Sequence, residues 1–215
     1  MVVKEKIKSA SVSGEEASAR PAKLLQVLFF LSGMAALAYQ VCWQRILFFS
    51  FGTDIESTTI IVSVFMLGLG LGALAGGWIA DRWFEKIILV FAGAELGIGL
   101  FGLASPTLLP RVSDVFIMSD RAVLALVNLV TLLLPTVLMG ATLPMLITYF
   151  TKIYKNIGVS TGSLYCINTL GAALGCYLTG CIGFRYLTLQ EVIVVAACVN
   201  ISVAGLILIK FRSLA

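Results

Sequence analysis

A single acidic residue, Glu95, stands inside a long apolar run and is the residue most able to do chemistry. It is the ninth residue of a run that begins at Ile87, which places it near mid-depth of a membrane span at a rise of about 1.5 Å per residue. A charge in hydrocarbon costs at least about 2.5–3.5 kcal/mol, so it needs a compensating role. Either Glu95 is a proton or cation site, or it is a neutral or hydrogen-bonded side chain that holds helices together.

Asn128 and several other polar side chains lie in the apolar runs, and four of these polar residues are candidate partners of Glu95. Asn168 and Asn200 come to similar depths, Gln40 lies nearer the outer side, and Arg45 is the only basic residue within a run. In the functional interpretation Asn168 or Asn200 helps to coordinate the cation. In the structural one Glu95 pairs with Arg45 or Gln40, and the amides join helices at about 0.6 kcal/mol each. A proton relay needs several titratable groups, and the apolar runs contain one acid at mid-depth and no histidine, which favours the structural role.

The same residues predict no metal site and no cofactor. The five cysteines all fall in apolar segments, no CxxC pair exists and histidine is absent, so we interpret the cysteines as small packing residues. The stretch Gly97–Gly102 spells the dinucleotide fingerprint GxGxxG, but that motif works only after a β-strand. Here it lies inside a predicted membrane span, so we expect no nucleotide there.

Composition points to a membrane protein. Hydrophobic residues make up 60% of the chain and charged residues 12%, whereas a soluble domain has about 25% charged residues. A helical bundle in lipid needs no polar shell, because lipid tails solvate its outer face. The net charge of +4 is interpreted as contact with anionic lipid in the bilayer, and no nucleic-acid partner is expected.

Apolar runs of about 20 residues or more predict an all-α integral membrane protein with six transmembrane helices. Pro106 and Pro110 are expected to end the third helix and to open a long outer loop. No tandem sequence repeat is obvious. The predicted spans are 24–50, 58–80, 87–105, 122–150, 158–184 and 191–209.

The distribution of Lys and Arg predicts the orientation. Eleven of the 15 fall on the side of the N-terminus, and four, Arg45, Arg111, Arg121 and Arg185, fall on the other. By the positive-inside rule both termini are cytoplasmic, in a multi-pass protein of the cytoplasmic (inner) membrane. Residues 1–23 are polar and predict a flexible cytoplasmic tail, and residues 210–215 form a cytoplasmic end.

Small residues recur every four positions in two of the predicted spans. Such stripes let another helix backbone approach closely, inside the chain or across a dimer. The stripes consist of Gly68, Gly72 and Gly76 in the second span, and of Gly171 and Gly175 in the fifth.

Several segments together resemble the membrane domain of the fused transporter/spermidine synthase-like integral membrane proteins of bacteria and archaea. The resemblance covers nearly everything from Leu24 to Ile209. The segments that carry it are Leu31–Arg45, Phe65–Gly72, Gly76–Arg82, Glu95–Leu100, Leu134–Pro144 and Gly162–Gly175.

This resemblance implies that the chemistry resides outside the chain. In that family the membrane domain precedes a soluble aminopropyltransferase-like domain with an S-adenosylmethionine-type Rossmann fold. This chain stops where that domain would begin, so we expect no enzymatic activity in it and assign any to a missing domain or a partner. Family members often have a glutamate where Gln40 stands, a departure that weakens any ionisable site in the first span.

The segment Gly77–Arg82 also resembles the cytoplasmic signature between the second and third helices of the major facilitator superfamily. There an aspartate and an arginine, here Asp81 and Arg82, latch helix ends together during transport. Trp83 and Phe84 replace the usual glycine and basic residue, so the match is partial. With six helices instead of twelve, the chain resembles one half of a major facilitator fold.

Three functions remain open at this point. The domain anchors or serves a spermidine synthase-like enzyme domain or separate protein at its cytoplasmic face. Alternatively two copies form a homodimeric transporter for a polyamine or another small cation, with Glu95 as counter-ion. The third is a structural subunit of a larger membrane complex.

Overall fold

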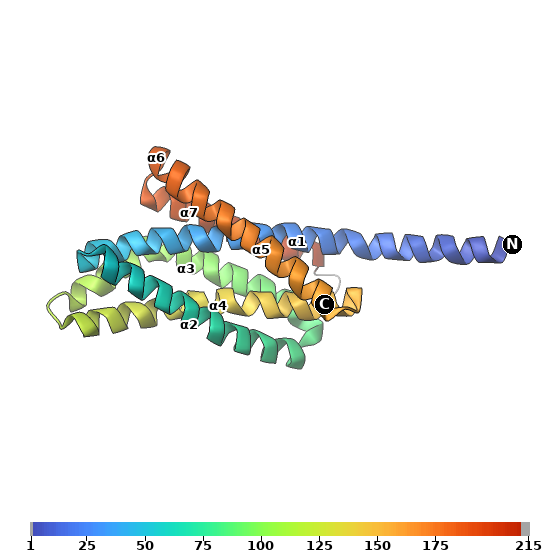
Figure 1. Ribbon diagram of the computed structural model, residues 1–215, viewed down its shortest axis with the longest axis horizontal. Helices are drawn as coiled ribbons and strands as arrows, with labels where there is room; N and C mark the ends of the chain where they lie inside the picture. The colour runs from blue at the N-terminus through green and yellow to red at the C-terminus, as the bar shows by residue number, and fades with distance from the viewer. Residues whose placement is uncertain (1, 212–215) are drawn as a thin grey trace.

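The computed structural model of the protein describes the backbone of residues 2–211 and the side chains of residues 22–211 (Figure 1). Six helical segments are long and apolar enough to cross a membrane: Ala22–Phe51, Asp54–Arg82, Phe84–Phe116, Arg121–Tyr154, Ile157–Tyr186 and Leu189–Phe211. The elements are α1 (Val2–Phe51), α2 (Asp54–Arg82), η1 (Phe84–Lys86), α3 (Ile87–Phe116), α4 (Arg121–Tyr154), α5 (Ile157–Tyr177), η2 (Leu178–Gly183), α6 (Phe184–Tyr186) and α7 (Leu189–Phe211).

The first helix is longer than its apolar part. The structure continues α1 as helix back to Val2, and this end projects beyond the bundle (Figure 1). The sequence predicts a flexible tail over 1–23, so the helical backbone differs from that prediction. Alanine, glutamate and lysine, which favour helix, are frequent there. Of the predicted cytoplasmic end, residues 212–215 lie outside the described part of the chain.

The predicted end of the third span at 105 is wrong, because α3 runs on through Pro106 and Pro110 to Phe116. Pro106 has no N–H to donate to the carbonyl of Gly102, one turn earlier. The hydroxyl Oγ of Ser105 donates to that carbonyl oxygen instead (2.8 Å), which satisfies the acceptor that the proline leaves free. The outer connection to α4 therefore shrinks to residues 117–120.

Helix pairing in the bundle has an internal two-fold pattern. The packed pairs include α2 with α4, α1 with α5, α3 with α4, α1 with α7, α1 with α2, and α4 with α5, while α3 packs on α7. Exchanging α1 with α4, α2 with α5 and α3 with α7 maps these pairs onto one another. The packing of α1 on α3 is an exception, because α4 and α7 have no comparable contact. In Figure 1, α2 and α5 lie nearest the viewer and α3 and α7 lie behind. Because α1 and α4 run in opposite directions, the two three-helix units are inverted relative to each other.

Both glycine stripes mediate contacts within the chain. A Cβ on Gly72 would overlap the backbone of α4 at Val137 and Gly140, and one on Gly175 would overlap the backbone of α1 at Met34. Gly68 and Gly76 face α4 in the same way, and Gly171 faces Phe30 of α1. These close contacts account for the packing of α2 on α4 and of α5 on α1.

The two stripes also share a register. Leu67-Gly68 and Leu71-Gly72 of α2 have the same spacing as Leu170-Gly171 and Leu174-Gly175 of α5. Each stripe therefore occupies the same place in its three-helix unit. Most helix contacts of the chain, and these segments of its sequence, therefore follow an internal repeat.

Large apolar side chains lie on both the inside and the outside of the bundle. Two buried clusters fill the interior, one around Trp43 and Phe65 and the other around Phe29, Phe91 and Phe150. Outward-facing apolar residues are numerous, and several are largely exposed: Phe49 (80%), Leu74 (74%) and Ile209 (79%). A water-soluble domain rarely shows so much apolar surface, whereas a membrane domain requires it.

The cysteines are an exception to their predicted packing role. Cys42 is buried, but four of the five are exposed on the outside of the helices. The packing interpretation is therefore wrong for Cys166, Cys176, Cys181 and Cys198. A small apolar side chain is tolerated on such a face as well as in the interior.

Candidate functional site

Glu95 of α3 joins three helices through two short hydrogen bonds. Ser32 of α1 donates from Oγ to Glu95 Oε1 (2.6 Å), and Asn200 of α7 donates from Nδ2 to Glu95 Oε2 (2.6 Å). Glu95 is 0% exposed, Asn200 1% and Ser32 6%. The three side chains meet because α3 packs on both α1 and α7. Together they form a polar junction within a largely apolar interior.

Both hydrogen-bond partners of the Glu95 carboxyl group are neutral. The salt bridge found among the described side chains, between Arg121 and Glu56, lies elsewhere in the molecule. An ionised carboxylate without a cation is costly in a low-dielectric interior, so the junction suits a bound proton or a small cation. Glu95 does not line the main clefts found along the described part of the bundle. In this arrangement the junction is sealed from solutes.

Two further polar atoms are buried close to the junction without a hydrogen-bond partner. They are Asn200 Oδ1 and Tyr39 Oη. Gly99, one turn beyond Glu95 on α3, packs against the Cβ of Asn200, and Gly102 packs against the Tyr39 hydroxyl. Unpaired buried polar groups are rare in proteins. Because these two atoms lie beside Gly99 and Gly102, they extend the polar junction along α3.

An aromatic pair continues this polar line along α1. Tyr39 stacks on Trp43 with ring centroids 5.1 Å apart. Trp43 donates from Nε1 to Ser105 Oγ (2.9 Å), so its only polar atom is satisfied. The same serine hydroxyl donates to the Gly102 carbonyl, as described above. Ser32, Tyr39 and Trp43 are spaced seven and four residues apart and therefore share one face of α1.

The five predicted polar residues divide into those at the junction and those away from it. Asn200 is at Glu95, but Asn168 donates from Nδ2 to the carbonyl oxygen of Phe29 (3.2 Å) and so ties α5 to α1. Arg45 is exposed, with its guanidinium 4.1 Å from the centre of the Phe184 ring, and Gln40 is half-buried on α1. The expected pairing of Glu95 with Arg45 or Gln40 is therefore wrong.

Sequence reasoning missed Ser32 and Tyr39. A serine in an apolar helix is common because it can bond its own backbone, so Ser32 gave no distinct signal. The heptad spacing of Ser32 and Tyr39 was the available signal, since it places both on one face with Trp43. Which helix that face meets depends on tertiary packing and is absent from local sequence.

A second equivalence places the junction at the interface of the two three-helix units. Ala92 and Glu95 of α3 have the same spacing as Ala197 and Asn200 of α7. Since α3 and α7 exchange under the internal two-fold pattern, Glu95 and Asn200 hold equivalent positions and contact each other directly. The carboxyl–amide bond therefore joins the two halves of the chain at their symmetry-related positions.

The end of the bundle that carries Asp81 and Arg82 is charged and exposed. Both residues line an open cleft of about 720 Å³ together with Lys86 and Lys152. Lys152 of α4 places its Nζ 3.2 Å from the centre of the Phe84 ring, which connects α4 to η1. Among the described side chains, neither Asp81 nor Arg82 forms a salt bridge. The contact between helix ends that the facilitator resemblance implies for these two residues is therefore absent from this arrangement.

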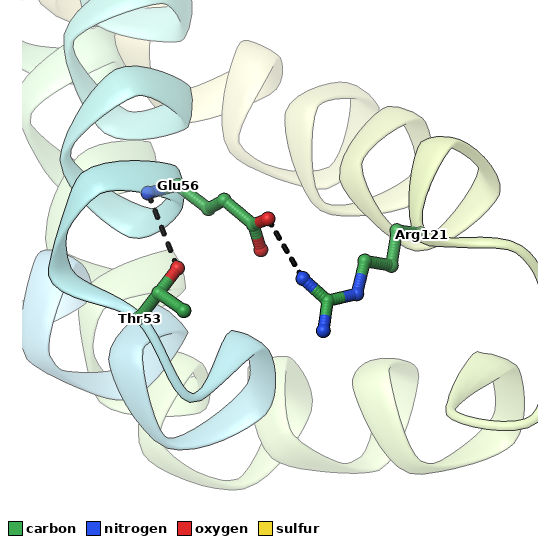
Figure 2. Close-up of polar contacts among 3 residues, drawn as sticks. All are labelled: Thr53, Glu56 and Arg121. Carbon is green, nitrogen blue, oxygen red and sulfur yellow. Dashed lines mark hydrogen bonds and ion pairs between the residues drawn. The ribbon is translucent and has the colours of Figure 1, made fainter.

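The opposite end is fastened by an ion pair between α2 and α4 (Figure 2). Arg121 donates from Nη1 to Glu56 Oε1 (2.8 Å), and Thr53 caps α2 by accepting from the Glu56 backbone N–H (3.4 Å). The two side chains are 73% and 39% exposed, so this pair contributes no more than about 1 kcal/mol. It aligns the first turns of two helices and offers no site for chemistry.

Comparison with known proteins finds no matching family model, no matching curated protein and no matching solved structure. The resemblance to the spermidine synthase-like membrane proteins therefore stays a prediction, and functional inference rests on the geometry.

Proposed function

We propose that this chain is a six-helix membrane domain that anchors or serves a spermidine synthase-like partner at its cytoplasmic face, with both termini in the cytoplasm. Six helices of sufficient length and an outer surface rich in Leu, Val and Ile support the membrane location. Any aminopropyl transfer takes place in the partner, and this chain supplies its attachment to the bilayer.

The enclosure of Glu95 is the observation that favours an anchor over a carrier. The carboxyl group is 0% exposed and both oxygens are occupied by side chains of neighbouring helices. A solute reaches it only if α1, α3 and α7 separate. In an anchor the junction has one role, to fix the relative positions of three helices.

Native mass spectrometry of the 23.0 kDa chain, extracted gently from its own membranes, tests this function. The expected result is a complex with a soluble protein of synthase-like size. A species of twice the chain mass without such a protein contradicts the anchor. A complex with other membrane subunits supports the structural-subunit alternative instead.

Labelling of single cysteines in a cysteine-free background tests the orientation. We expect Glu85→Cys, in the exposed turn after α2, to react only from the cytoplasmic side, and Ser119→Cys, between α3 and α4, only from the other. Both positions are exposed, so they are matched in accessibility. Reversed or identical labelling contradicts the proposed topology.

A half-transporter that works as a homodimer is the second candidate, and the inverted pairing of the two three-helix units favours it. Carriers built from inverted repeats place substrate and coupling ions at the repeat interface, and here that interface holds Glu95 and Asn200. For this candidate, Glu95→Gln abolishes polyamine uptake into vesicles with the fold intact. Uptake that persists in Glu95→Gln contradicts it.

A further inference from the structure

The charged cleft at the junction of α2, η1 and α4 has the features of an anion site. Its volume is about 720 Å³, and its wall includes the three cations Arg82, Lys86 and Lys152. Asp81 and Glu85 also line it, which leaves one net positive charge among these five groups. That charge complements a single phosphate diester.

The amino end of α3 opens on the same cleft. Its N-cap residue is Lys86, which makes no side-chain capping bond, and no acidic residue lies in its first turn. The N–H of Ile87 donates to the carbonyl oxygen of Phe84 and that of Lys86 to Trp83, so it is the positive end of the α3 dipole, without an acidic partner, that favours an anion here. The positive end of the α3 dipole and the three cations therefore act on the same space.

An adjoining cleft extends this site along apolar side chains. Its volume is about 360 Å³, and it shares Phe84 and Glu85 with the charged cleft. The rest of its lining is Ile87, Ile88, Leu89, Tyr149 and Phe211. A cationic cleft that continues into an apolar one suits an amphiphile with an anionic head.

Aromatic side chains mark the depth of this site. Trp78 and Trp83 have ring centroids 6.5 Å apart and are 65% and 53% exposed. Exposed tryptophans beside a charged turn are typical of the headgroup level of a bilayer. Lys152, held over the Phe84 ring, directs an ammonium group to the same level.

We propose that this composite cleft binds an anionic glycerophospholipid. Its phosphate lies at the amino end of α3 between Arg82, Lys86 and Lys152, and an acyl chain follows Ile88 and Leu89. The inference rests on the proposed membrane location of the chain. It adds a lipid site at the cytoplasmic face, next to the surface where the partner of the anchor would dock.

Quenching of tryptophan fluorescence by brominated lipids tests the site. The full chain is reconstituted in phosphatidylcholine vesicles that contain brominated phosphatidylglycerol or brominated phosphatidylcholine, and Trp83→Phe identifies the contribution of the cleft. We expect wild-type protein to prefer phosphatidylglycerol several-fold. Each lost cation lowers the preference by up to about fivefold, so Arg82→Gln/Lys86→Gln brings it close to that of a neutral surface.

The matched control is Arg111→Gln/Arg185→Gln, which removes the same charge from exposed positions at the other end of the bundle. It should leave the preference unchanged. Glu85→Gln removes a negative charge from the cleft and should raise the preference for phosphatidylglycerol. This variant keeps the site testable if Arg82→Gln/Lys86→Gln folds poorly. Equal quenching of wild-type protein by both lipids, or an equal loss in the control, overturns the lipid site. A chain that fails to enter the vesicles contradicts the membrane domain itself, so the two failures are distinguishable.

Discussion

Replacing one glycine of α2 by alanine should destabilise the bundle, whereas the same change two residues away should not. The added Cβ of Gly72→Ala would meet the carbonyl oxygen of Val137, the Cα of Gly140 at 2.8 Å and the backbone nitrogen of Ala141 at 2.9 Å. These are backbone atoms of α4, which cannot rotate away. A Cβ on Gly70 meets nothing within 4 Å.

The magnitude follows from comparing the two variants. Both exchange glycine for alanine in a helix interior, which favours the helix by about 0.5–1 kcal/mol in each case and so cancels. The difference is the overpacking at the α2–α4 contact, which costs about 1–3 kcal/mol. We therefore expect Gly70→Ala to match or exceed wild-type stability and Gly72→Ala to fall below Gly70→Ala by that amount.

Thermal unfolding in detergent, followed by size-exclusion chromatography, measures this difference. A loss of 1–3 kcal/mol lowers Tm by roughly 2–12 °C for a chain of this length. The corresponding pair on α5 repeats the experiment, because a Cβ on Gly175 overlaps the backbone of Met34 and one on Gly162 has open space. Equal stability of Gly72→Ala and Gly70→Ala would refute the close approach of α2 and α4.

Three further changes have defined outcomes. Glu95→Gln keeps the size and hydrogen-bonding capacity of the side chain and should change the free energy of unfolding by less than about 1 kcal/mol. Glu95→Ala should lower the free energy of unfolding by about 2–5 kcal/mol, because it leaves a cavity and unpaired donors. Chemical denaturation in micelles compares the two variants. Trp43→Phe loses the bond to Ser105 and should lower stability by about 1–3 kcal/mol in the same assay, and an unchanged midpoint would contradict that bond. Glu56→Gln removes the exposed ion pair with Arg121 and should lower stability by no more than about 1 kcal/mol, with the difference from wild type shrinking as salt is added.

The six apolar helices were predictable because hydrophobic length is a local property of the chain. The end of α3 was not, because the sequence shows Pro106 but not the hydroxyl of Ser105 that accommodates it. For the polar residues, too, the local sequence did not show which side chains are neighbours in the fold. Depth along a span identified Glu95 and Asn200, but depth does not say which helices are neighbours, so Arg45 and Gln40 were wrong partners and Ser32 was missed. The resemblance of the two glycine stripes became visible only once the helix pairs were known.

The long separation of the junction residues along the chain has a consequence for biogenesis. Ser32 precedes Glu95 by 63 residues and Asn200 follows it by 105. At about 5–20 residues per second, a ribosome needs roughly 5–20 s to make the segment between Glu95 and Asn200. During that interval only Ser32 of α1 can donate a hydrogen bond to the carboxyl group of Glu95. An insertion machinery that releases helices one by one would leave this acid exposed to lipid, so the synthesis of this chain favours retention of α1 and α3 as a pair until α7 arrives.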